Sequence, residues 1–115
     1  MVLRPSRGEI WLADLDPTRG HEQMGWRPVL IVSANLFNHG PAGLVFVLPL
    51  TRTFRGIPVH VPVEPPEGGL REPSYILCDG LRSIAKERLH GPPWGKVSAA
   101  TMRQVEDRLR ILISL

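Results

Sequence analysis

The stretch "GLVFVLPL", residues 43–50, decides the fold. Its side chains are apolar at odd and even positions alike, so a strand here has both faces covered and runs through the interior. Pro49 cannot donate to a ladder, which predicts that the far end of this strand has left the sheet. A second apolar stretch, "PVLIVS" at 28–33, is rich in β-branched residues and predicts another buried strand.

Shorter strands are predicted around this pair. Residues 8–15 alternate in hydrophobicity and lead into the turn sequence "DPTRG", and "SYILC" at 74–78 is another apolar run. In "GIPVHVPVE" (56–64), Pro58 and Pro62 remove N–H donors from the same side of the strand. That pattern predicts an unpaired edge of the sheet.

The end of the chain changes period. In "SAATMRQVEDRLRILISL", Ser98 is placed as an N-cap, and apolar side chains recur at helical spacing at Met102, Val105, Leu109 and Leu112. This predicts an amphipathic helix that packs on the sheet. Residues 81–91 fit either an irregular hairpin or a 3₁₀ turn between two strand pieces. We expect residues 1–115 to form a single, mainly β (α+β) domain: a small, SH3-like, strongly curved antiparallel β-barrel or half-barrel with a C-terminal α-helix.

Composition narrows the class of protein. The formal net charge of +3 over 115 residues favours a polyanionic partner, although a surface that is merely basic explains it equally well. The single cysteine, Cys78, cannot form an internal disulfide, which predicts a reducing cytoplasm and a thiol buried as a small apolar group. No signal peptide and no apolar run of ~20 residues is present, so a soluble protein without a membrane segment is expected.

Several kinds of site are excluded by their missing patterns. The histidines at 21, 39, 60 and 90 show no metal-ligand spacing and no C-x-x-C occurs, so neither a metal nor a cofactor is expected. No nucleophile elbow, P-loop or dinucleotide fingerprint is present. Asp14 and Asp16 sit in "DLDP" and are expected to cap a turn.

Two polar residues remain, each at the end of an apolar strand. Arg27 directly precedes residues 28–33, and Thr51 directly follows residues 43–50. A guanidinium in such a place can hold a phosphate through two parallel hydrogen bonds. The structural alternatives are an ion pair of Arg27 with Glu22 or Asp79 and, for Thr51, a simple strand-end hydroxyl.

The segment "RGEIWLADLDPTRGHEQMGWRPVLIVS" resembles the opening of the MazF/PemK/Kid family of bacterial toxin endoribonucleases. The family pattern, R-G-[ED]-[IV] followed by D-P-x-x-G-x-E-Q-x-G-x-R-P, is met here from Arg7 to Pro28. The resemblance continues through "VLPLT", "ILCDGLRSIAKERL" and the final helix, so it covers nearly the whole chain.

This resemblance implies an activity and partners. A homodimer would cleave single-stranded RNA, typically mRNA, without the ribosome and without a metal, leaving a 2′,3′-cyclic phosphate and a 5′-hydroxyl and so inhibiting translation. A cognate antitoxin would block the RNA groove with an acidic, extended tail that folds on binding.

By position in the family pattern, Arg27 matches the catalytic arginine and Thr51 the catalytic threonine. Arg27 is expected to stabilise the crowded, charged phosphorane, and Thr51 to orient the phosphate. His21 and Glu22 are both candidates for the base that takes the 2′-proton, with a histidine that only touches RNA as the alternative for His21. Gln23 is expected to contact the substrate.

Two positions depart from the family pattern. Leu77 stands where the Kid-like branch has a catalytic arginine, so Asp79 is expected to contact RNA or to be structural rather than to catalyse. Gly80 stands where many members have glutamine, which should alter the base contacts. The loop "TRTFRGIP" adds three candidate RNA contacts suited to an unstacked strand, with a simple hairpin tip as the alternative: Arg52, Phe54 and Arg55.

Two other functions fit the same fold. One is a binding protein like the CcdB-type toxins, which poison DNA gyrase without cutting nucleic acid. That mode resembles readout through an aromatic C-terminal tail, whereas this chain ends "RILISL". The other is a catalytically silent relative that binds only an antitoxin or RNA.

Overall fold

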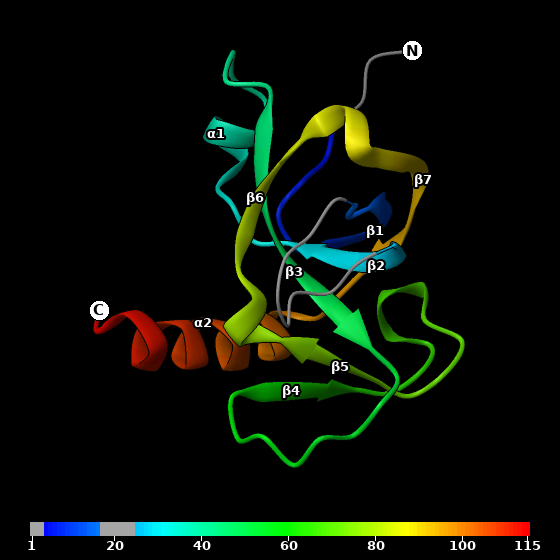
Figure 1. Ribbon diagram of the computed structural model, residues 1–115, viewed down its shortest axis with the longest axis vertical. Coiled ribbons are helices and arrows are strands. Elements are labelled where there is room, and N and C mark those ends of the chain that lie inside the picture. The colour runs from blue at the N-terminus through cyan, green and yellow to red at the C-terminus, as the bar shows by residue number, and fades with distance from the viewer. Residues whose placement is uncertain (1–3, 17–24) are drawn as a thin grey trace.

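The computed structural model describes residues 4–16 and 25–115. These residues form seven strands (Figure 1): β1 (Glu9–Asp14), β2 (Trp26–Ile31), β3 (Leu44–Thr51), β4 (His60–Val63), β5 (Ser74–Leu77), β6 (Arg82–Ala85) and β7 (Leu89–Lys96). They also form the helices α1 (Asn35–Asn38) and α2 (Ala99–Ile113) and the 3₁₀ turns η1 (Glu67–Gly69), η2 (Cys78–Gly80) and η3 (Lys86–Arg88).

The strands pair antiparallel in the order β4-β5-β3-β2-β1-β7, and β6 pairs with β3 off this path. Within residues 4–16 and 25–115, no pairing joins β4 to β7, so the expected barrel is an open sheet. The prediction of a mainly β, antiparallel fold with a C-terminal helix is confirmed. The edge predicted for residues 56–64 is confirmed by the end position of β4, although only His60–Val63 is strand.

β3 changes partners along its length. Residues 44–47 pair with β6, residues 47–49 with β2, and residues 50–51 with β5. The carbonyl of Phe46 faces β2, where it accepts from the N–H of Val32 at 3.0 Å. Because backbone groups alternate in direction, Pro49 faces the opposite side, at the break between β6 and β5. Its missing donor costs no ladder bond, so the prediction that the strand has left the sheet there is wrong.

β2 stops pairing with β3 at Pro28. The carbonyl of Ile31 accepts from Gly8 N at 2.8 Å and therefore faces β1, so by the same alternation the backbone of Pro28 faces β3. Pro28 has no N–H to donate to β3. The last residue of β2 that pairs with β3 at this end is its neighbour Val29. The two strands continue beyond this point without pairing.

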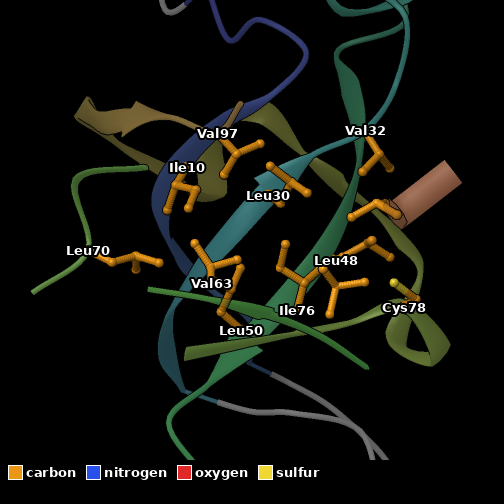
Figure 2. Close-up of a cluster of buried hydrophobic side chains, with 12 residues drawn as sticks. Ile10, Leu30, Val32, Leu48, Leu50, Val63, Leu70, Ile76, Cys78 and Val97 are labelled. Atoms are coloured by element: carbon orange, nitrogen blue, oxygen red, sulfur yellow. The ribbon is translucent and has the colours of Figure 1, made fainter. Parts of the chain in front are cut away.

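Two apolar clusters cover the two faces of the central strands. Side chains of β2 and β3 alternate between them: Leu30 and Leu48 belong to the cluster of Figure 2, and Val29 and Val47 to the second. All four are fully buried. The prediction that residues 43–50 are covered on both faces is therefore confirmed for residues 47–50 and wrong for the start of the strand, where Leu44 and Phe46 are 37% and 39% exposed.

α2 packs against the first cluster, as its period predicts. Val105 is fully buried, and Met102 and Leu109 pack against the cluster, but Leu112 remains 41% exposed. The predicted cap is confirmed: Ser98 Oγ accepts from Thr101 N at 3.1 Å. Among the described residues, no helix has the length and hydrophobicity to cross a membrane.

Cys78 lies in the same cluster and is 1% exposed. Burial raises the pKa of its thiol to about 12. The prediction of a buried, small apolar side chain is confirmed.

The segment 81–91 contains β6, η3 and the start of β7, which confirms a 3₁₀ turn between two strand pieces. The rest of β7 has no counterpart in the expected strands. Its sequence, "LHGPPWGK", has neither apolar alternation nor β-branched residues.

Candidate functional site

A cleft of about 690 Å³ lies where β2 and β3 stop pairing. Leu12 of β1, Pro28 of β2 and Leu50 of β3 give it an apolar part. The remaining lining residues come from the start of β2, the end of β3, the segment 69–74 and β7: Trp26, Arg27, Thr51, Arg52, Gly69, Leu70, Arg71, Glu72, Ser74 and Trp94. Segments far apart in the sequence thus meet around one opening.

The cleft brings Arg27 and Thr51 together, as the sequence predicts. Arg27 is half-buried and lies opposite Ala13 in the β1–β2 register. Thr51 is 6% exposed, and its hydroxyl accepts from Thr53 N at 3.2 Å. A hydroxyl that accepts in this way keeps its proton to donate to an anion in the cleft.

Positive charge dominates the cleft. Its lining residues include three guanidinium groups, those of Arg27, Arg52 and Arg71, against the single carboxylate of Glu72. Arg52 Nη1 lies 3.1 Å from Glu72 Oε2, in an ion pair whose side chains are 72% and 59% exposed. Such an exposed pair is weak and exchanges partners readily. The cleft is therefore suited to a negatively charged ligand.

One wall of the cleft is held by a close backbone approach. Gly69 has φ +74°, and a Cβ added there would lie 2.0 Å from the carbonyl oxygen of Trp94, so no larger residue fits. At the preceding turn, the Glu67 carboxylate accepts from Thr101 Oγ1 at 2.5 Å and from Ser98 N at 2.9 Å. Burial raises the pKa of Glu67, but these hydrogen bonds outweigh it and the net pKa is lowered.

The turn that leaves β1 is fixed beside the cleft. Asp16 N donates to Asp14 Oδ1 at 3.1 Å, and Gly25 N donates to Asp16 Oδ1 at 2.9 Å, so the prediction that both aspartates cap a turn is confirmed. The Arg88 guanidinium also donates to the backbone carbonyls of Asp14 and Asp16. Local sequence patterns predict no role for Arg88, because its partners are 72 and 74 residues away.

His21, Glu22 and Gln23 lie outside the described residues, so their assignments stay predictions. Asp79 does not line the cleft, and its Oδ1 lies 3.0 Å from Nε2 of His60. Gly80 does not line it either, and an added Cβ there would meet the Pro49 ring at 3.0 Å. The structure therefore places Asp79 and Gly80 apart from Arg27 and Thr51.

The candidate residues in the loop after β3 also differ in whether they line the cleft. Arg52 lines the cleft, whereas Phe54 and Arg55 do not. Phe54 is 72% exposed, and its ring centroid lies 5.6 Å from that of Tyr75.

Sequence reasoning missed two aromatic lining residues, Trp26 and Trp94, which are 56% and 43% exposed. The available signal was their setting: each stands beside a glycine, outside any apolar run, in "GWRP" and "PPWG". Among the described residues, no group of three His, Cys, Asp or Glu side chains is arranged to hold a metal ion.

Known proteins share both the sequence pattern and the fold. Residues 6–113 match the family described as the PemK-like, MazF-like toxin of type II toxin-antitoxin systems. Endoribonuclease MazF9 of Mycobacterium tuberculosis is 36% identical over 95% of this chain and 96% of its own length. Endoribonuclease PemK of Escherichia coli is 38% identical over 94% of this chain and 81% of its own.

Solved structures agree with this match. MazF from Deinococcus radiodurans superposes with a TM-score of 0.88 at 25% identity, covering 99% of this chain and 100% of that one. A mycobacterial endoribonuclease in complex with its cognate antitoxin superposes with a TM-score of 0.79 at 32% identity, covering 96% of each chain. The chain described here therefore belongs to the PemK-like, MazF-like toxin family of type II toxin-antitoxin systems.

Proposed function

We propose that this protein is an endoribonuclease that cuts single-stranded RNA in the cleft between β2 and β3, without a metal ion. The enzyme class rests on the family and on the two curated relatives, both endoribonucleases. The observation that carries the site assignment is that Arg27 and Thr51, 24 positions apart in the sequence, line one basic cleft.

The proposed reaction is an internal transfer at phosphorus. The RNA 2′-oxygen forms a bond to the adjacent phosphorus while the bond from phosphorus to the 5′-oxygen breaks. The 2′-proton passes to a base, and a proton is supplied to the departing 5′-oxygen. The products are a 2′,3′-cyclic phosphate and a 5′-hydroxyl, and no electron transfer is involved.

Arg27 and Thr51 have distinct parts in this reaction. The guanidinium stays protonated at all physiological pH values, so Arg27 neutralises the charge that builds on the non-bridging oxygens. The Thr51 hydroxyl donates to the same phosphate and fixes its orientation. The half-buried position of Arg27 strengthens this interaction, because less water screens it.

His21 and Glu22 remain the two candidates for the base, and Gln23 for a substrate contact. The described residues on either side support this role. Gly25, which directly precedes β2, donates its N–H to Asp16 Oδ1 at 2.9 Å. Arg52 would contact the RNA backbone, and Phe54 and Arg55 would extend that contact beyond the cleft. For Asp79 and Gly80, an RNA contact requires a strand that continues past η2.

The toxin role implies a cognate antitoxin, as in the solved complex of the mycobacterial relative. We expect an acidic segment of that partner to occupy the basic cleft and to exclude RNA. The single domain over residues 1–115, the homodimer and the cytoplasmic location also belong to this proposal.

The test is incubation of the purified protein with single-stranded RNA in EDTA, comparing wild type with Arg27→Ala. We expect wild type to cut and Arg27→Ala to lose roughly 10²- to 10³-fold in rate, as when one donor to a developing oxyanion is removed. Arg103→Ala, on the exposed side of α2 and outside the cleft, removes the same charge and serves as the control. Equal rates for Arg27→Ala and wild type would overturn the site assignment, and loss of cutting in EDTA would overturn metal independence.

A further inference from the structure

Two of the three tryptophans are exposed, and both line the cleft. Trp26 lies at the start of β2 and Trp94 on β7, the two strands that flank β1. Trp11, between them on β1, is only 3% exposed and belongs to the second core cluster. Large aromatic side chains left in water around one opening indicate a binding surface rather than packing.

The ring of Trp26 and the backbone of Trp94 each contact a neighbouring element. The ring of Trp26 meets His90 edge-on, with centroids 4.5 Å apart and planes at 65°. His90 lies opposite Leu12 in the β1–β7 register, so this contact spans the apolar part of the cleft. The backbone of Trp94 packs against Gly69, where no side chain fits. Little freedom of the Trp26 ring and of the Trp94 backbone is therefore lost when a ligand binds in the cleft.

The cleft offers more than a phosphate requires. Its volume of about 690 Å³ falls in the range of whole small-ligand sites. Beyond the arginines, Leu12 and Pro28 add apolar surface, and Glu72 and Ser74 add hydrogen-bonding groups. A flat apolar ring with polar edges, joined to a phosphate, matches this combination. Such a ring stacks on tryptophan, and its amino and carbonyl groups pair with carboxylate, hydroxyl or guanidinium.

We infer that Trp26 and Trp94 form a nucleobase subsite, in which a base next to the scissile phosphate stacks on tryptophan while Arg71 and Glu72 contact its polar edge. This inference rests on the proposed function and extends it to substrate recognition. The charge of the cleft favours nucleic acid over an apolar peptide as the occupant, because three guanidiniums surround the aromatic surface.

The binding test uses a short, fluorescein-labelled, single-stranded DNA of random sequence, which lacks the 2′-hydroxyl and cannot be cut. Anisotropy titrations compare wild type, Trp26→Ala, Trp94→Ala and Trp94→Phe. We expect each alanine variant to bind about 5- to 100-fold more weakly and Trp94→Phe to recover most of the loss. Leu36→Ala, which removes a 91% exposed apolar side chain of α1 outside the cleft, should bind like wild type.

The specificity test uses random-sequence RNA and sequencing of the 5′ ends produced. We expect Trp94→Ala to change the base preference at one position beside the cut and to raise KM more than it lowers kcat. Circular dichroism and thermal unfolding confirm that each variant is folded.

The outcomes separate the two proposals. Arg27→Ala cutting like wild type defeats the proposed function itself. Loss of cutting in Arg27→Ala, with unchanged binding and unchanged base preference in both tryptophan variants, overturns only the nucleobase subsite. That second result is the one expected if the tryptophans serve a protein partner.

Discussion

The two ends of β3 pair with different strands. Toward its start the strand is flanked by β6, and at residues 47–49 by β2, and both Val45 and Val47 are fully buried. At its last two residues β3 pairs with β5, while β2 is no longer paired with it. Val45 at the first end belongs to the core, whereas Thr51 at the second end lines the cleft. One strand can thus pack in the core and also present a side chain to the cleft, at the point where its pairing with β2 has stopped.

Prolines mark the change from one end to the other. Pro28 has no N–H for β3, and the β2–β3 ladder ends beside it. Pro49 faces the break between β6 and β5, where a donor is not needed. Residues 47–50 of β3, directly before Thr51, are all buried, so the hydroxyl is positioned by the core rather than by a loop.

The largest expected effect is a loss of stability that leaves the cleavage rate almost unchanged. Leu48→Ala removes a fully buried side chain of the first cluster and should lower the free energy of unfolding by about 2–5 kcal/mol. Urea unfolding measures the loss. The cleavage rate per folded molecule should stay close to that of wild type at low temperature. A large loss of rate in the fully folded variant would show that the two ends of β3 are not separable.

The next expected effect is a loss of cleavage rate with little change in stability. Thr51→Val keeps the shape of the side chain but removes the hydroxyl, so cleavage should fall about 10- to 100-fold, the cost of one hydrogen bond to a charged group. Single-turnover cleavage of RNA measures this. Stability should change by less than about 1 kcal/mol, although Thr53 N loses its acceptor. Thr51→Ser restores the hydroxyl and should recover most of the rate; a variant series with no difference in rate would remove Thr51 from the site.

The smallest effect concerns Glu67, which lies in the turn η1 together with the cleft residue Gly69. Because the folded-state pKa of Glu67 is lowered from 4.5, its charge adds stability at neutral pH, and this is lost as the pH falls through the folded-state value. Glu67→Gln should therefore be less stable than wild type at neutral pH by about 1 kcal/mol, and the difference should shrink in acid. Urea midpoints over this pH range measure it, with the exposed Glu64→Gln as control. A difference independent of pH would exclude a role for the charge.

Much of the fold could be predicted from the local sequence pattern. The burial of both faces over residues 47–50, the edge position of β4 and the Ser98 cap of α2 each depend on residues close in the sequence. β7 could not be predicted in full, because "LHGPPWGK" is strand only through its pairing with β1. The break at Pro49 needed the positions of β5 and β6, which no local pattern supplies.

The candidate site was predictable to a similar extent. The family pattern pointed to Arg27 and Thr51, and the structure places both in one cleft. It did not point to Trp94 or Glu72, because these reach the cleft only after the chain has turned through Gly69 and β7.

The burial of Cys78 has a practical consequence. With its pKa near 12, the sole thiol of the chain holds almost no thiolate at neutral pH, and maleimide reagents have little access to it. The wild-type protein should therefore react very little with thiol-directed labels. A cysteine introduced at the rim of the cleft could carry a spin label or fluorophore alone, and the arrival of RNA or antitoxin could be followed from that one position.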